Sequence, residues 1–202
     1  MNEKGYIKYN LNWTRSDPVI PVEEFVSLNT WREVLYNLQM IGVDKQGFGY
    51  GNISIRKDRT KHFFITGSET GAVKSLGEEH YCLVTDYNIL SNSLSCKGPV
   101  KASSESMSHA AVYDSVSEIN AVIHIHHHNL WNTLLDKVPV TPEHVEYGTP
   151  EMAESIKRLL KIPGVKEKRI IVMAGHTDGI LFFGKHLDEA GAYTLSYFNE
   201  TV

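Results

Sequence analysis

Along the chain, segments with apolar residues at helical spacing alternate with short apolar runs that are typical of strands. After Pro21, the apolar residues from Phe25 to Ile41 follow helical spacing and Gly42 ends the pattern, so we predict a helix here. Between such stretches lie apolar runs of strand length. The remaining predicted helices run from Ser103 or Ser104 through Val112, over His128–Leu135, from Thr149 through Leu160 and from Leu187 onward, and the predicted strands are Ile53–Ile55, His62–Ile65, Tyr81–Val84, Ala121–His126, Arg169–Ala174 and Gly179–Phe183.

The order of these elements predicts an α/β protein. Mixed short strands and helices indicate a sandwich around a central, largely antiparallel sheet, and 202 residues suit one domain with a sizeable core. The alternation over Tyr6–Trp13 is weak and fits an edge strand or an ordered arm, whereas Leu94–Pro99 is expected to form a turn. We therefore expect an N-terminal arm over residues 1–20 and a single domain over residues 21–202.

Composition narrows the class of partner. The formal net charge is −4 with histidine neutral, which gives no electrostatic reason to expect nucleic acid or an anionic membrane as partner. The apolar runs have the length of strands rather than of membrane spans, and the first ten residues lack the apolar core of a signal peptide. Cys82 and Cys96, outside any Cys-x-x-Cys pair, fit a reducing compartment. We expect a cytoplasmic protein whose small anionic substrate meets positive charge from a metal ion or from backbone N–H groups.

Two histidines stand at strand spacing in His124-Ile125-His126. Because successive side chains of a strand point to opposite faces, His124 and His126 share one face, about 6–7 Å apart along the strand. Two imidazoles so placed can converge on one divalent ion. Simple surface enrichment is the alternative, since His127 and His128 follow directly. The strand spacing beside an apolar run favours the metal site.

A metal ion needs further ligands, and the turn Gly175–Gly179 offers two of them. It follows an apolar strand and contains His176 and Asp178, which are again two residues apart, so either could share a face with the first pair. The alternative is an ordinary turn, for which Asp-Gly is typical. The residues alone leave the choice between His176 and Asp178 open.

Polar turns of a kind that can hold an anion occur three times. Ser103-Ser104-Glu105 stands at a predicted helix start, where hydroxyl and backbone N–H groups are suited to a phosphate and Glu105 could act as general base or metal ligand. Gly51-Asn52-Ile53-Ser54 and Thr66-Gly67-Ser68 are short turns of the same type. Each one alone is better explained as an ordinary cap or turn.

Taken together and in this order, these motifs resemble the class II aldolase/adducin family. Its landmarks are a Gly-Asn-x-Ser turn, a Thr-Gly turn, a Ser-Ser-Glu/Asp motif and a His-x-His pair. The chain has Gly51–Ser54, Thr66-Gly67, Ser103–Glu105 and His124–His126 in that order, and the match spans about residues 25–190. Any one motif is unspecific, but the ordered set is specific.

The resemblance implies a fold, an assembly and a site. The fold would be a three-layer α/β/α sandwich around a central, mostly antiparallel sheet, and the assembly a C4 homotetramer with sites near the subunit interfaces. His124 and His126 with one later ligand would bind zinc or a similar divalent ion, with Glu105 as acid/base at the metal. His176 is favoured over Asp178 as the later ligand, because a carboxylate would lower the charge of the site and weaken the Lewis acid. The substrate phosphate would be held by Asn52, Thr66, Gly67, Ser103 and Ser104.

The implied activity is that of a metal-dependent lyase, an aldolase that cleaves a small phosphorylated ketose-like substrate through a metal-stabilised enediolate. Two alternatives stay open. The same metal site could epimerise a pentulose phosphate or dehydrate a methylthioribulose phosphate, or the chain could be an adducin-like interaction module without catalysis. Retention of His124, His126 and Glu105 favours an enzyme. The stretch from Asp136 to Thr149 is short, and Tyr147 lies in it without matching the tyrosine motif of the sugar-phosphate aldolases.

Overall fold

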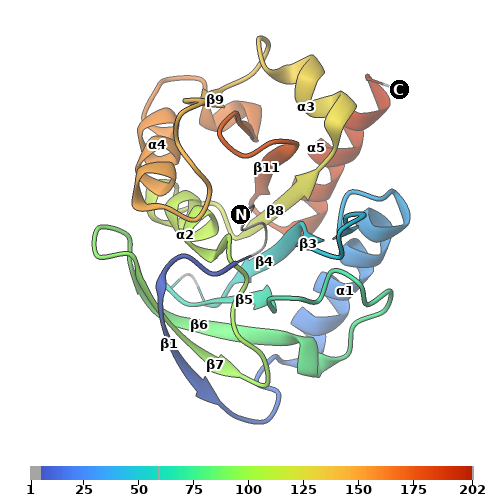
Figure 1. The fold of residues 1–202 in the computed structure, drawn as a ribbon, viewed down its shortest axis with the longest axis vertical. Helices are drawn as coiled ribbons and strands as arrows, with labels where there is room; N and C mark the ends of the chain where they lie inside the picture. The colour runs from blue at the N-terminus through green and yellow to red at the C-terminus, as the bar shows by residue number, and fades with distance from the viewer. Residues whose placement is uncertain (1–5, 59, 202) are drawn as a thin grey trace.

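A nine-stranded sheet crosses the whole molecule (Figure 1). The computed structural model describes residues 6–58 and 60–201. The strands lie in the order β1-β7-β6-β5-β4-β8-β11-β10-β9. The two outer pairs, β1 with β7 and β9 with β10, are parallel, and the inner pairs are antiparallel. The bounds are β1 (Asn10–Arg15), β4 (Asn52–Arg56), β5 (Phe63–Thr66), β6 (Tyr81–Asn88), β7 (Ser93–Gly98), β8 (Ala121–His126), β9 (Val140–Thr141), β10 (Ile170–Met173) and β11 (Gly179–Gly184), and a separate ribbon pairs β2 (Gly42–Val43) with β3 (Gly49–Tyr50).

Helices cover both faces of this sheet, so the predicted three-layer α/β/α sandwich around a mostly antiparallel sheet is confirmed. One core lies between the sheet and α2 and α4, and the other lies between the sheet and α1, α3 and α5. Within the described residues, none of these helices has the length and apolar character needed to cross a membrane. Their bounds are α1 (Val22–Asn37), α2 (Ser106–Ser115), α3 (His128–Leu134), α4 (Pro150–Leu160) and α5 (Leu187–Asn199), with short 3-10 turns at Glu78–His80 and Lys166–Lys168.

Alternation along β8 fixes which residues face each core. Ile123 and Ile125 are fully buried in the core beneath α1 and α5, and Val122 is buried in the core beneath α2 and α4. Each such side chain contributes about 1.5–3 kcal/mol by leaving water. A one-residue slip of register would exchange the two faces of the strand. His124 and His126 are therefore held on the face of Val122, the α2 and α4 side.

Most predicted elements are present, and the differences have local causes. The first helix ends at Asn37 rather than near Ile41, because the chain turns at Gln39, which has a φ of 58°. Thr149 caps α4 as its sequence suggests, accepting a hydrogen bond from the Met152 N–H, with Pro150 at the first helical position. Of the stretch Tyr6–Trp13, residues 10–13 lie in an edge strand, β1.

The predicted turn over Leu94–Pro99 is wrong, because this segment belongs to strand β7. Leu94 and Cys96 are buried, whereas Ser93 and Ser95 are partly exposed and Lys97 is exposed. That is the alternation of a strand with one face on a core. β7 pairs with β6 on one side and with β1 on the other, so it lies inside the sheet and not at a reversal of the chain.

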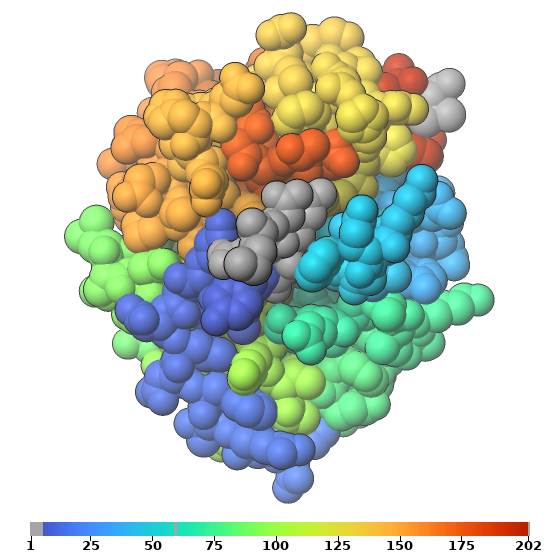
Figure 2. Space-filling model, viewed as in Figure 1, coloured from blue at the N-terminus to red at the C-terminus, as the bar shows by residue number. Residues whose placement is uncertain are grey.

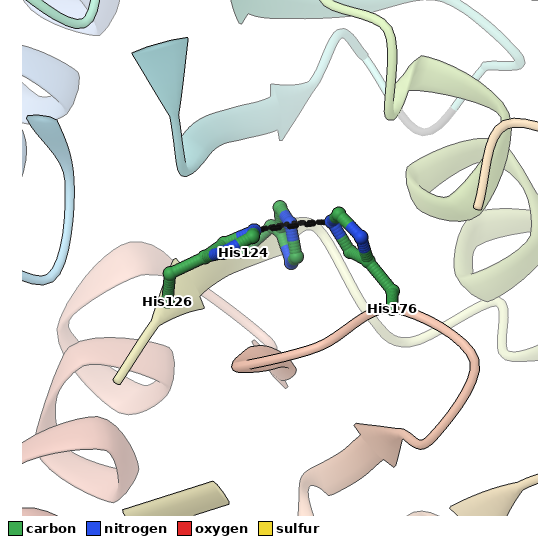
Figure 3. A group of neighbouring side chains, drawn as sticks. All are labelled: His124, His126 and His176. Carbon is green, nitrogen blue, oxygen red and sulfur yellow. Dashed lines mark hydrogen bonds between the residues drawn. The ribbon is translucent and has the colours of Figure 1, made fainter. Parts of the chain in front are cut away.

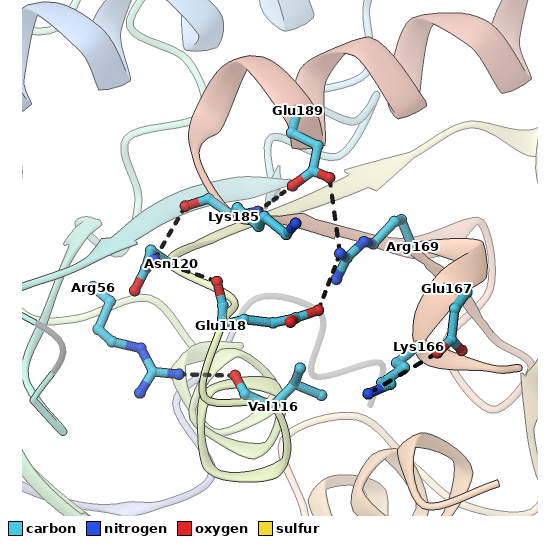
Figure 4. Close-up of polar contacts among 9 residues, drawn as sticks. All are labelled: Arg56, Val116, Glu118, Asn120, Lys166, Glu167, Arg169, Lys185 and Glu189. Atoms are coloured by element: carbon cyan, nitrogen blue, oxygen red, sulfur yellow. Dashed lines mark hydrogen bonds and ion pairs between the residues drawn. The ribbon is translucent and has the colours of Figure 1, made fainter. Parts of the chain in front are cut away.

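The end of the sheet opposite His126 is closed by a polar network (Figure 4). The Arg169 guanidinium lies 3.2 Å from Glu118 Oε1 and 3.8 Å from Glu189 Oε1. Glu189 in turn accepts a hydrogen bond from the Lys185 N–H, and the Asn120 amide donates to the Lys185 carbonyl at 3.1 Å. These contacts join the start of β8, the start of β10 and the end of β11 to the start of α5. The histidines lie at the opposite end of β8.

Candidate metal centre

Three imidazoles converge where β8 ends beside the turn between β10 and β11 (Figure 3). The Nε2 atoms of His124 and His126 are 3.2 Å apart, those of His126 and His176 3.0 Å, and those of His124 and His176 3.3 Å. Three nitrogens bound tetrahedrally to one ion at about 2.0–2.1 Å would lie about 3.3 Å from one another. The spacing of the three nitrogens fits such an ion with shifts of a few tenths of an ångström.

The backbone holds the first two histidines rigidly. β8 is paired on both sides, with Asn52 opposite His124 on β4 and Gly179 opposite His126 on β11. The His126 N–H donates to the Met40 carbonyl at 2.9 Å. Gly51 allows this close packing: its φ is +75°, and a Cβ there would lie 2.7 Å from Ile41 and 3.1 Å from the His124 carbonyl oxygen.

Burial keeps His124 in the neutral form that can ligate a metal. The residue is 1% exposed, and desolvation lowers its pKa to about 4. Its Nδ1 lies 3.2 Å from the Ile180 carbonyl oxygen, which can only accept, so Nδ1 carries the proton and donates. The Nε2 lone pair is then directed at the other two histidines. A second bond of this kind orients most metal-binding histidines.

Asp178, the other candidate for the third ligand, lies outside this group of three. Its carboxylate accepts a hydrogen bond from His128 Nδ1 at 2.8 Å, and the His128 side chain is 67% exposed. Asp178 has a φ of 70°, a turn conformation that Asp tolerates better than most residues. The turn thereby directs His176 to the histidine pair and Asp178 toward the surface.

Glu105 is a buried carboxyl group at the start of α2. It is 2% exposed, and Ser108 Oγ donates to its Oε2 at 2.7 Å. Its Oε1 is buried and has no hydrogen-bond partner among the described residues. Burial raises the pKa of Glu105 to about 7, and the Ser108 hydrogen bond and the charge of Lys8 oppose the rise. A carboxyl with this pKa can both give and take a proton near neutral pH.

The predicted cap of this helix is wrong, because neither Ser103 nor Ser104 caps α2. The helix begins at Ser106, and Glu105 itself occupies the N-cap position without a side-chain cap bond. The N–H and hydroxyl of Ser106 both donate to the Ser103 carbonyl oxygen, at 3.0 Å and 2.7 Å. The turn is therefore closed through a main-chain carbonyl, and the side chain of Glu105 is brought to the end of the helix rather than into its first turn.

The three polar turns predicted to hold an anion are brought together in pairs. Asn52 opens β4 opposite His124, is 5% exposed, and its Oδ1 is buried without a partner among the described residues. Thr66 ends β5, and its hydroxyl accepts from the Ile53 N–H at 3.3 Å. Gly67 bridges to Ala102, next to Ser103. The Thr66-Gly67 turn thus lies beside both Asn52 and the Ser103-Ser104 turn.

Among the five residues predicted to bind the phosphate, Gly67 has no side chain and no free backbone N–H to donate. Its N–H donates to the His80 carbonyl at 2.8 Å, so that N–H is already used within the fold. A Cβ at this position would lie 2.4 Å from the Val100 side chain, which explains why glycine stands here. Gly67 allows the two turns to approach, while side chains such as Asn52 and Ser103 supply polar atoms.

A buried polar cluster behind the histidines was missed by the sequence reasoning. Ser54 Oγ lies 2.7 Å from His109 Nδ1 and 2.7 Å from the Tyr113 hydroxyl. His109 is fully buried, and its Nε2 has no partner among the described residues. Desolvation, and next the charge of His124, lower the pKa of His109 well below its ordinary value. His109 follows Glu105 by one helical turn, so this face of α2 is directed at His124.

Tyr147 and Lys8 were also not assigned to the site, and both lie at its edge. The Tyr147 ring packs on the His176 ring with centroids 4.5 Å apart. Lys8 Nζ lies 4.1 Å from the centroid of the same tyrosine ring. In the sequence, only the position of Tyr147 within the short Asp136–Thr149 stretch indicated that this residue could lie near the site. The sequence offers none for Lys8, which is separated from Tyr147 by most of the chain.

The sequence matches one family model over most of its length. The model described as Class II Aldolase and Adducin N-terminal domain covers residues 39–199, which takes in every element from β2 to α5. Among curated proteins, none matches the chain significantly.

Solved structures share the fold at low sequence identity. YgbL from Klebsiella pneumoniae, described as a candidate aldolase/epimerase/decarboxylase, has a TM-score of 0.68 at 19% identity, over 89% of this chain and 86% of that one. An L-fuculose 1-phosphate aldolase has a TM-score of 0.67 at 18% identity, over 92% and 86%. The l-fuculose-1-phosphate aldolase from Thermus thermophilus has a TM-score of 0.61 at 22% identity, over 90% and 91%. At these identities the likeness establishes the fold.

Proposed function

We propose, from the premise that this chain belongs to the class II aldolase and adducin N-terminal domain family, that it is a metal-dependent aldolase. Its substrate would be a small phosphorylated ketose, cleaved at a carbon–carbon bond. The observation that carries the proposal is the convergence of three Nε2 atoms at 3.0–3.3 Å. Three imidazoles with an open fourth position are a ligand set typical of a catalytic metal.

His124, His126 and His176 would hold the ion. Neutral imidazole suits several divalent metals, and the near-tetrahedral spacing of the three nitrogens favours Zn²⁺ among them. When bound, the ion would supply Lewis-acid polarisation of the substrate oxygens. Asp178, engaged with His128, would remain outside the ligand set, so the three protein ligands would add no negative charge to the metal.

Glu105 would handle the proton. Cleavage of an aldol requires that a proton leave the hydroxyl of the departing carbon and that a proton reach the carbon left behind. Oε1 of Glu105 is buried and without a partner among the described residues, so it can hold such a proton, while the Ser108 bond fixes the other oxygen. A pKa of about 7 is suited to both directions of transfer.

Asn52, Thr66, Ser103 and Ser104 would bind the substrate phosphate, with Gly67 allowing their close approach. Three of these, Asn52, Thr66 and Ser103, are buried polar residues. The Oδ1 atom of Asn52 has no hydrogen-bond partner among the described residues, and burying a polar group is favourable only when it finds a partner. Asn52 stands opposite His124 in the sheet, so the phosphate would lie within one small molecule's length of the metal.

We further propose a homotetramer. Supporting this, Val22 and Val26 on α1 expose 64% and 55% of their surface, and apolar residues so exposed on one helix face are common at subunit contacts. Light scattering of the purified protein tests the assembly, and a monomer at micromolar concentration would contradict it.

Metal analysis combined with a substrate panel tests the function. The purified protein is expected to contain one divalent ion per chain and to release dihydroxyacetone phosphate from at least one ketose 1-phosphate, L-fuculose 1-phosphate included. Glu105→Gln should keep the ion and lose cleavage by about 10²–10⁴-fold. Glu151→Gln, which alters an exposed acid in the first turn of α4, is the matched control.

The outcomes separate the possible reactions at this site. Isomer exchange without cleavage would replace the aldolase proposal with epimerisation, and a dehydrated product would replace it with dehydration. A metal-loaded protein that converts no substrate of the panel would contradict the proposed enzyme.

A further inference from the structure

The segment ahead of the family-matched region is anchored against the site. β1 pairs with β7 over its whole length, and the Asn92 amide donates to the Lys8 carbonyl at 3.1 Å. The Tyr9 hydroxyl lies 3.0 Å from the carbonyl oxygen of Ala102 and 2.9 Å from that of Ser103. Tyr9 is 5% exposed. Residues 8 and 9 therefore have a fixed position beside the Ser103-Ser104 turn.

From this anchor, Lys8 extends to the segment that carries Tyr147. Its side chain is 19% exposed, with Nζ 3.1 Å from Glu146 Oε2 and 4.1 Å from the centroid of the Tyr147 ring. Lys8 lies close to Gly148, since a Cβ at that position would be in van der Waals contact with Cβ and Cδ of Lys8, at 3.4 Å from each. Figure 2 shows the N-terminal segment, in blue, lying against the orange region of the chain on this face.

One ring contact and one electrostatic interaction connect Lys8 to the reacting groups. Tyr147 also packs on His176, so one aromatic ring separates the ammonium from a candidate metal ligand. The charge of Lys8 also acts on the Glu105 carboxyl. In a chain of net charge −4, this places a cation at the edge of a site that is proposed to take an anionic substrate.

We propose that Lys8, held by Tyr9 and lying outside residues 39–199, binds an anionic group of the substrate, in addition to the contacts proposed for Asn52, Thr66, Ser103 and Ser104, and so determines specificity. This inference rests on the proposed function. The group recognised is a phosphate or carboxylate oxygen, to which an ammonium donates a charge-assisted hydrogen bond.

The present partner of Lys8 can be exchanged for a ligand. The Glu146 side chain is 75% exposed, and ion pairs with so exposed a partner contribute little to stability. An incoming anion can thus replace Glu146 without leaving a buried charge unpaired. Tyr147 would retain the ammonium in place through its ring face, a cation–π contact.

Anion binding by matched variants tests the inference. Inorganic phosphate and glycolate are titrated calorimetrically into the wild type, Lys8→Met, Lys8→Arg and Glu146→Gln. The set is repeated in a His124→Ala, His126→Ala background, in which the outcome does not depend on a bound metal. Lys8→Met should weaken binding of one probe about tenfold or more, the size of one charge-assisted hydrogen bond. Lys8→Arg should largely restore it, and Glu146→Gln should not weaken it.

The probe whose binding depends on Lys8 identifies the group as phosphate or carboxylate. The salt dependence of binding should fall in Lys8→Met, because a charge is lost, whereas a purely packing role would change the melting temperature and leave that dependence intact. Equal binding of both probes by wild type and Lys8→Met would overturn the inference. So would binding of neither probe by the wild type. If Lys8→Met also weakens binding of the probe in the His124→Ala, His126→Ala background, the inference stands even where the aldolase proposal fails.

Discussion

Glu105→Gln should stabilise the metal-free protein as the pH rises, although it removes the proposed catalytic group. The pKa of Glu105 is raised from 4.5 to about 7, chiefly by burial. The folded state therefore holds this proton more tightly than the unfolded state does. In the wild type, the proton on Glu105 therefore stabilises the folded state. This contribution to the free energy of unfolding is complete below pH 4.5 and is lost as the pH rises to about 7. A difference between 4.5 and about 7 corresponds to about 3 kcal/mol.

Urea unfolding of both proteins between about pH 4.5 and 8.5, with the metal removed by a chelator, measures this effect. Because the glutamine side chain of the variant carries no titrating proton, the variant's free energy of unfolding should gain about 3 kcal/mol relative to the wild type across this range. Glu151→Gln, at an exposed position, should follow the wild type. Parallel curves for Glu105→Gln and the wild type would refute the burial argument for Glu105.

Three further variants test other parts of the structure. Ser54→Ala removes the hydroxyl shared by His109 and Tyr113 and should cost about 1–3 kcal/mol in urea unfolding, because it leaves buried polar groups unpaired; an unchanged stability would contradict that network. Arg169→Met removes the ion pairs with Glu118 and Glu189 at the far end of the sheet and should lower the free energy of unfolding by about 1–3 kcal/mol. Metal content measured by mass spectrometry should stay the same, and a loss of metal would contradict the view that Arg169 is independent of the metal site. Asp178→Asn removes the negative charge beside an exposed histidine and should change the free energy of unfolding by less than about 1 kcal/mol. A larger loss would show that the charge of Asp178 supports the site.

Local patterns predicted the layers and the first two histidines of the site. Strand alternation is a property of the backbone itself, so His124 and His126 could be placed on one face from their spacing. The segment Ser93–Gly98 shows the limit of such reasoning. Its serines and glycine are typical of turns, and only its pairing with two neighbouring strands makes it a strand.

The residue pattern alone could not distinguish His176 from Asp178 as the third ligand, although the family resemblance favoured His176. Both residues lie in one turn, and alternation applies only to extended backbone. The left-handed conformation of Asp178 and its contact with His128 decide the direction of each side chain. The same holds for Glu105, whose helical position could be estimated but whose complete burial depends on tertiary packing.

Long-range contacts were beyond local patterns altogether. Lys8 meets Glu146, 138 residues later, and Tyr9 meets Ser103, 94 residues later. His109 lies among small apolar residues of α2 and is indistinguishable in sequence from a core histidine with an ordinary hydrogen bond. Its link to Ser54 required the positions of β4 and α2 relative to each other.

The metal content of His176→Ala compared with that of Asp178→Ala tests the central claim most directly. Each protein is purified in the same way, and divalent metal per chain is measured by mass spectrometry. The convergence of the three Nε2 atoms predicts that the wild type and Asp178→Ala each hold one ion per chain and that His176→Ala holds little or none. Full metal content in His176→Ala, or its loss in Asp178→Ala alone, would contradict the account.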